Sequence, residues 1–221
     1  MKKWFVFIFV LIISLSGCQQ EISLNKKLSE KVKIVEEKDY LFSKLEVTYE
    51  DYKEATKDII SDSCSYIENK LIYGYTDNGK KIEVRGIDLK GLSKEEFKKH
   101  KQKWNELVKK FNLKLDDDKV TIRISGSYDA NVNDKDYKYV YSQQIRESND
   151  KENSVYIINK RYTFEKQDDS WKIINIDSYI SSYSDKLKES GLSKNELISK
   201  MKYGTHNNKA VEYILSFALK E

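Results

Sequence analysis

The sequence has no proline, only two cysteines and only two histidines among its 221 residues. The absence of proline excludes a proline-rich stalk, PxxP ligand segments and a collagen-like repeat. Two cysteines exclude a disulfide-stapled scaffold, and two histidines exclude a histidine-rich metal centre. The composition is polar, with 34% charged residues, yet its 12% of aromatic residues is more than a disordered chain carries. A folded domain with its own core is therefore expected.

The N-terminal segment is the most informative part of the sequence. Lys2 and Lys3 precede an apolar run over residues 4–13. This run is shorter than the roughly 20 residues of a membrane span, and it is typical of the hydrophobic region of a signal peptide. The next residues, Leu15-Ser16-Gly17-Cys18, resemble the lipobox of bacterial lipoproteins. The resemblance implies that a diacylglycerol is joined to the Cys18 thiol and that cleavage removes residues 1–17.

This resemblance also implies a location and a first partner. The protein is expected at the extracytoplasmic face of the cell membrane, with the lipid bilayer bound through acylated Cys18. The alternative is an ordinary signal peptide or a short buried helix. Removing residues 1–17 leaves 221 minus 17, or 204, residues and lowers the formal charge from +4 to +2. Cys64 is then the only other thiol, and no Lys, Arg or His in the adjacent sequence activates it.

Helix and turn signals divide the rest of the chain. Residues 18–47 are expected to form a short helix or a flexible tether. Capping-box patterns begin at Thr48, Ser93 and Ser193 and predict three helix starts. The helix after Ser93 carries an apolar stripe that includes His100 and Trp104. Alternating residues on both sides of the turn at 77–79 predict a hairpin over 67–84. The final stripe predicts a helix, and its members are Val211, Ile214, Leu215, Ala218 and Leu219.

Four strands are predicted between the second and third of these helix starts. Their ranges are 120–124, 137–141, 155–164 and 171–176. Because parallel strands need crossover connections of a dozen or more residues, the short links require an antiparallel meander. One apolar face of this sheet must be covered, and we expect the helix carrying Trp104 to cover it.

The order helix, hairpin, helix and meander resembles the NTF2-like (SnoaL-like) α+β cone over residues 48–180. The closing hairpin, Arg161–Glu165 followed by Ser170–Ile176, is similar to the last hairpin of many exported NTF2-like domains. The resemblance implies an α+β fold in which helices pack on a bent antiparallel sheet. Residues 181–221 are then a C-terminal helical extension. A cystatin-like sheet wrapping one helix and a generic α+β sandwich are the alternatives.

The sequence contains none of the familiar nucleotide-binding, hydrolase or zinc-binding motifs. His100, His206 and Cys64 have no metal-ligand spacing, so no metal and no cofactor are expected. Lysines cluster on the helix that carries Trp104, but the net charge of the mature chain argues against nucleic acid as a partner. That cluster favours a soluble helix face, or a contact with anionic lipid heads or wall polymers.

The expected function is a binding or interaction module without a catalytic site, and its partner is an unknown envelope protein or a small ligand. The residues expected to line a cavity or make contacts are His100, Trp104, Tyr73, Tyr137, Tyr139 and Tyr141. One alternative is an enzyme that processes a small ligand in the open end of the cone, with His100 as a candidate acid or base. A further alternative is an accessory or immunity subunit of an envelope machine.

Overall fold

The structure is a computed structural model. It describes the backbone of residues 2–64, 71–77, 80–87, 92–110, 119–147 and 155–219. Within these ranges, the side chains of residues 2–22, 71–77, 80–87, 107–108 and 186 lie outside the description. The predicted lipidation site, Cys18, and the predicted contact residue Tyr73 are both among those side chains.

In the described part of the chain, three helices and a hairpin precede four long strands, and two short helices and three further strands follow them. The helices are α1 (Lys2–Ser43), α2 (Tyr49–Thr56), α3 (Lys94–Lys110), α4 (Asp185–Glu189) and α5 (Lys194–Lys200). The strands are β1 (Leu71–Asp77), β2 (Lys80–Ile87), β3 (Lys119–Val132), β4 (Lys135–Glu147), β5 (Val155–Gln167), β6 (Ser170–Tyr183), β7 (Thr205–His206), β8 (Lys209–Ala210) and β9 (Tyr213–Leu219).

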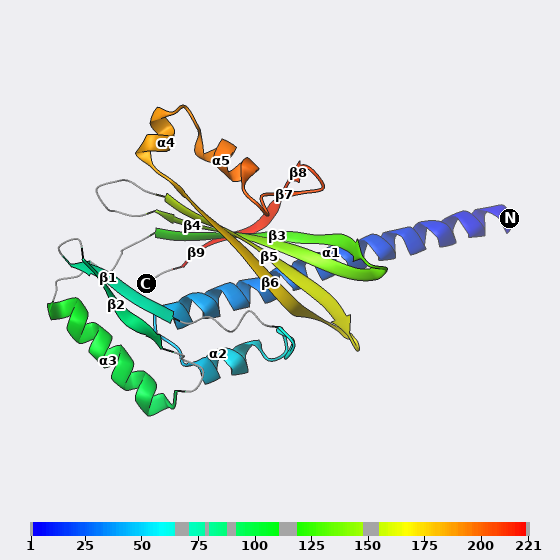
Figure 1. Ribbon diagram of the computed structural model, residues 1–221. Coiled ribbons are helices and arrows are strands. Elements are labelled where there is room, and N and C mark those ends of the chain that lie inside the picture. The colour runs from blue at the N-terminus through cyan, green and yellow to red at the C-terminus, as the bar shows by residue number, and fades with distance from the viewer. Residues whose placement is uncertain are drawn as a thin grey trace.

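The centre of the molecule is a five-stranded antiparallel sheet in the order β6-β5-β4-β3-β9 (Figure 1). Strands β3 to β6 form the predicted meander, because each pairs antiparallel with the next along the chain. The backbone also contains the predicted hairpin as a separate two-stranded sheet of β1 and β2. The α+β class and the antiparallel meander are therefore confirmed.

The prediction of a final helix over the C-terminal stripe is wrong. Residues Tyr213–Leu219 form strand β9, which pairs antiparallel with β3. Leu215, Phe217 and Leu219 pack against the main core, so the apolar side chains follow a period of two as well as a helical period. A short apolar run fits both periods, and the free edge of β3 decides between them by satisfying the backbone of β9.

Helix α1, and not α3, covers the sheet. Leu28, Val32 and Val35 of α1 are fully buried in one core with residues of β3 to β6. The expectation that the Trp104 helix covers the meander is therefore wrong. Phe97 and Trp104 of α3 pack instead in a smaller cluster near the C-terminal end of α1, where their partners are Phe42, Leu45 and Leu92. The segment predicted as a tether or short helix thus supplies the layer that buries the inner face of the sheet.

Two layers lie on opposite sides of the sheet (Figure 1). Helices α1, α2 and α3 lie on one side, and α4, α5 and the β7–β8 hairpin lie on the other. A second core joins this outer layer to the sheet through Ile157, Tyr183 and Met201. One end of β6 is also paired with the chain after α2, because Ile173 exchanges backbone hydrogen bonds with Ile59 and Ser61.

The three predicted capping boxes are present. The hydroxyls of Thr48, Ser93 and Ser193 each accept a hydrogen bond from the backbone three residues ahead. The acidic side chain at that third position accepts hydrogen bonds in return. In the described part of the chain, no helix combines the length and the apolar character needed to cross a membrane.

Candidate functional site

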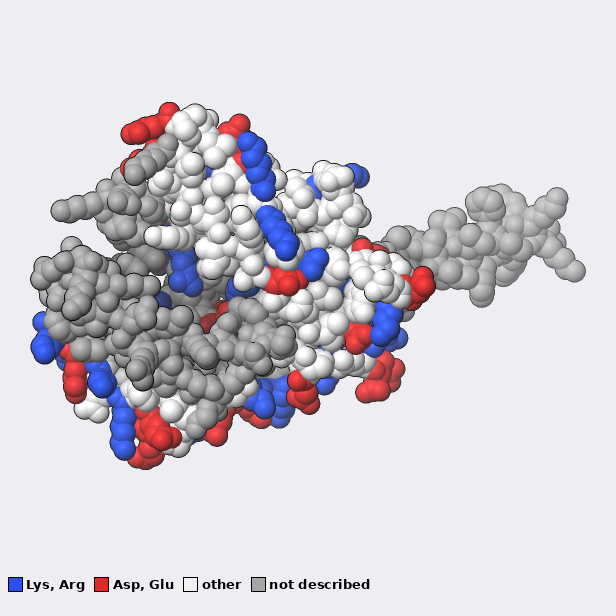
Figure 2. All heavy atoms as spheres, in the orientation of Figure 1, with Lys and Arg blue, Asp and Glu red and all other residues white. Residues whose placement is uncertain are grey.

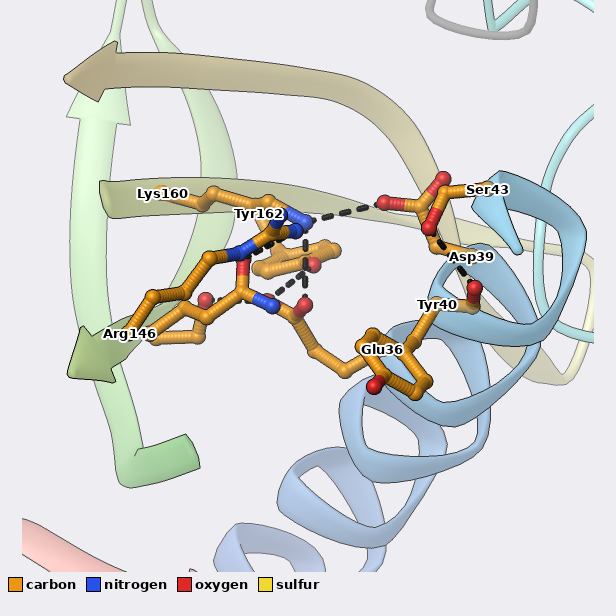
Figure 3. Close-up of polar contacts among 9 residues, drawn as sticks. Glu36, Asp39, Tyr40, Ser43, Arg146, Lys160 and Tyr162 are labelled. Carbon is orange, nitrogen blue, oxygen red and sulfur yellow. Dashed lines mark hydrogen bonds and ion pairs between the residues drawn. The ribbon is translucent and has the colours of Figure 1, made fainter. Parts of the chain in front are cut away.

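A cluster of charged and polar side chains lies between α1 and the inner face of the sheet (Figure 3). Lys160 of β5 is at its centre, and its Nζ lies 2.9 Å from Glu36 Oε2 and 3.0 Å from Asp39 Oδ2. The Glu36 and Lys160 side chains are 1% and 5% exposed, whereas the Asp39 side chain is 29% exposed. The cluster therefore runs from a fully buried carboxylate to one that reaches solvent.

Glu36 is an acceptor in each of its hydrogen bonds. Its Oε1 accepts from the Tyr162 hydroxyl at 2.7 Å and from the Ser142 hydroxyl, while Oε2 accepts from Lys160. A carboxylate that accepts from three donors has its position fixed by them. The arrangement therefore joins α1 to β4 and β5.

Arg146 lies beside this cluster, on the same face of β4 as Ser142 (Figure 3). Its Nη2 is 3.5 Å from Gln144 Oε1, which is a weak contact. Its buried Nε has no hydrogen-bond partner among the described residues. With Arg146 included, the polar cluster contains two acidic side chains, Glu36 and Asp39, and two basic ones, Lys160 and Arg146, so its formal charge is balanced.

A second cluster, of aromatic side chains, lies on the outer face of the sheet. The His206 ring lies 4.6 Å from the Tyr128 ring and 5.9 Å from the Tyr141 ring, measured between centroids. The guanidinium of Arg161 lies over Tyr139 at 4.7 Å and over Tyr203 at 5.0 Å, measured to the ring centroids. These contacts hold the segment from Met201 to β7 against β4 and β5.

One hydrogen bond in the aromatic cluster joins β4 to the C-terminal segment. The Tyr141 hydroxyl lies 2.9 Å from His206 Nδ1. Burial raises the pKa of Tyr141 to about 12, although the nearby Arg161 opposes the rise. Burial also lowers the pKa of His206. At neutral pH this bond therefore joins a protonated tyrosine hydroxyl to a neutral imidazole, and the imidazole tautomer sets which of the two atoms donates.

Arg161 also forms an ion pair on this outer face. Its Nη2 lies 2.7 Å from Asp177 Oδ2, and the two side chains are 29% and 32% exposed. Burial acts to lower the pKa of Arg161, but the hydrogen bond to Asp177, the charge of Asp177 and the nearby tyrosines together raise that pKa above its ordinary value. The stacked guanidinium is therefore a fixed cation with its own counter-ion.

The structure separates the contact residues predicted from the sequence. Tyr139 and Tyr141 lie together in the aromatic cluster, and Tyr137 precedes them on the same face of β4. His100 and Trp104 lie on α3, where Trp104 belongs to the small cluster with Phe97. The five predicted residues whose side chains are described therefore lie in two separate places, and Tyr73 lies outside the described side chains.

Several members of the two clusters have no counterpart in the sequence predictions, although some carried a signal. Lys160 lies between Ile158 and Tyr162 on the same face of β5. These two neighbours predict that this face is buried, so a lysine there is a sign of a buried ion pair. Glu36 likewise follows Val32 and Val35 on the buried side of α1. His206 and Tyr203 carried no such signal, because only the folding of the C-terminal segment brings them to β4.

The surface in view carries a mixture of charges (Figure 2). Over the region of α3, basic and acidic side chains are interspersed rather than gathered into a face of one sign. Within the residues whose side chains are described, no group of three or more His, Cys, Asp or Glu is arranged to hold a metal ion.

In comparisons with known proteins, no protein-family model, no curated protein and no solved structure matches the chain.

Proposed function

We propose that this chain is a lipoprotein anchored at the extracytoplasmic face of the cell membrane, and that its domain is a non-catalytic binding module with an NTF2-like fold. The lipobox at Leu15–Cys18 supports the anchor. The order of the elements supports the fold, because two helices, a hairpin and a third helix precede an antiparallel meander covered by α1.

The observation that carries the proposal is the continuity of α1. The helix is unbroken from Lys2 to Ser43, so it leads from the proposed anchor directly into the core. Cys18 and Leu24, which packs against the core, are six residues apart, or about 9 Å along a helix at 1.5 Å per residue. An acylated Cys18 would therefore hold the domain close to the membrane surface.

The same helix fixes which parts of the domain lie far from the membrane. Phe42 is 24 residues beyond Cys18, which corresponds to about 36 Å along α1, and α3 packs against Phe42. In Figure 1, α3 and the N-terminal end of α1 lie at opposite ends of the molecule. The lysines of α3 would then face away from the lipid heads of the anchoring membrane, which favours wall polymers over lipid as their contact.

The polar cluster supports binding over catalysis. Glu36 accepts from three donors, and Lys160 is shared between two carboxylates. A general acid or base must exchange a proton with substrate, and neither group is arranged to do so. The cluster instead attaches the anchoring helix to the sheet. An enzyme that uses His100 has no support from this geometry, because His100 lies on α3 and not in the cluster.

Labelling of the two cysteines tests the anchor. Cells expressing the wild type, Cys18→Ala or Cys64→Ala would be fed a radioactive palmitate and then fractionated. We expect label and membrane association for the wild type and for Cys64→Ala, because Cys64 is buried in the core. Both should be lost in Cys18→Ala. Retention of label in Cys18→Ala would refute the lipoprotein proposal.

A further inference from the structure

The outer face of the sheet presents a set of half-exposed aromatic side chains, which we call the tyrosine face. Its members are Tyr137, Tyr139, Tyr179, Tyr203 and His206 together with the ion pair of Arg161 and Asp177. Tyr179 is 45% exposed, whereas an aromatic side chain normally buries most of its surface. These residues come from β4, β5, β6 and the C-terminal segment.

Strand register places the members from the sheet on one face. Tyr139 is opposite Thr163 of β5, Arg161 is opposite Asp177 of β6, and Asn159 is opposite Tyr179. Because side chains alternate along a strand, Arg161 and Thr163 share a face with Asn159, away from α1. The rings of Tyr139 and Tyr179 are two strands and four residues apart, or about 16 Å at ordinary strand spacing.

The charge of this face selects the kind of ligand. The cation of Arg161 is paired with Asp177, Lys202 Nζ lies 5.0 Å from the centroid of the Tyr203 ring, and burial lowers the pKa of His206. A polyanion or an acidic peptide would therefore meet one lysine at the edge of the tyrosine face and, at its centre, a cation that already has a counter-ion. A ligand that is rich in hydroxyls and carries no charge suits flat rings flanked by a planar guanidinium and a carboxylate.

We infer that the tyrosine face binds a neutral glycan chain. Tyrosine rings offer flat surfaces for the C–H faces of sugars, and the outer edges of Arg161 and Asp177 can hydrogen-bond to neighbouring hydroxyls. The separation of about 16 Å between Tyr139 and Tyr179, estimated from strand spacing, gives room for a short run of linked sugars. The inference rests on the extracytoplasmic location proposed above, where cell-wall glycans are accessible.

The test measures binding of chitotetraose, the linear tetramer of N-acetylglucosamine, by titration calorimetry. The full-length protein is extracted in a zwitterionic detergent, because sugar-based detergents would compete. Tyr179→Ser should weaken binding at least tenfold, since it removes an exposed ring without disturbing the core. The matched control is Tyr156→Ser, because Tyr156 is 43% exposed but lies on the opposite face of the sheet. This variant should bind within twofold of the wild type.

Three results would overturn the inference. They are an absence of binding by the wild type, equal affinity of the wild type and Tyr179→Ser, and equal weakening by the two tyrosine variants. Circular dichroism of each variant would confirm that its fold is retained. Because the assay uses purified protein whether or not Cys18 is acylated, a negative result leaves the anchor proposal standing, and a failed palmitate experiment leaves this binding test valid.

Discussion

Removal of the Lys160 ammonium should destabilise the domain strongly, because it leaves a buried carboxylate without its counter-ion. Lys160→Met keeps most of the side-chain volume but deletes the bonds to Glu36 at 2.9 Å and to Asp39 at 3.0 Å. Glu36 is 1% exposed, so water cannot replace the lost donor. Breaking one side of such a pair costs about 3–5 kcal/mol, a large part of the 5–15 kcal/mol by which small domains are stable.

A double-mutant cycle separates the ion pair from general loss of packing. In Glu36→Gln combined with Lys160→Met, neither buried charge remains, and the glutamine oxygen still accepts from Tyr162 and Ser142. The double variant should therefore be at least about 2 kcal/mol more stable than the sum of the two single changes predicts. Urea unfolding followed by circular dichroism gives each free energy of unfolding.

An exposed ion pair of the same length provides the control. Lys101 Nζ lies 3.0 Å from Glu46 Oε2, but the two side chains are 35% and 53% exposed. Lys101→Met should change the free energy of unfolding by no more than about 1 kcal/mol. The reasoning fails if Lys160→Met is no more destabilising than Lys101→Met, or if the two changes at Glu36 and Lys160 are additive.

Two further predictions concern the C-terminal segment. Burial lowers the pKa of His206 below that of an unfolded histidine, so the unfolded state binds more protons at acidic pH, and stability should be lost as the pH falls below about 6.5. Urea midpoints of the wild type and His206→Gln at pH 8 and pH 5 measure this loss. An equal pH dependence in the two proteins would contradict it. Leu215→Ala, on the side of β9 that packs on the core, should cost about 2–3 kcal/mol, whereas exposed Ile214→Ala should cost less than about 1 kcal/mol. Equal losses in these two variants would argue against β9 as a core strand.

Local signals predicted much of the fold. The capping boxes at Thr48, Ser93 and Ser193 each contain both of their hydrogen-bonding partners within four residues, so the sequence alone specifies them. The same holds for the meander, because short links leave antiparallel pairing as the only option. The C-terminal strand was mispredicted because its apolar residues satisfy both helical and strand periods.

The two clusters were harder to predict because their members are distant in sequence. Glu36 and Lys160 are 124 residues apart, and Tyr141 and His206 are 65 residues apart. The tyrosines of β4 were recognised as candidates because they alternate on one strand. Their partners Arg161, Tyr203 and His206 became candidates only when β5 and the C-terminal segment were placed against that strand.

The sequence by itself determined the starts of three helices and the antiparallel meander, because each depends on residues that are close together in the chain. The proposed lipobox likewise depends on the sequence alone. Only the tertiary structure decided that α1 covers the sheet, that the C-terminal stripe is a fifth strand, and that Lys160 joins Glu36. Those outcomes depend on which surface buries an apolar face or a charge most completely, and that choice is made between segments far apart in sequence.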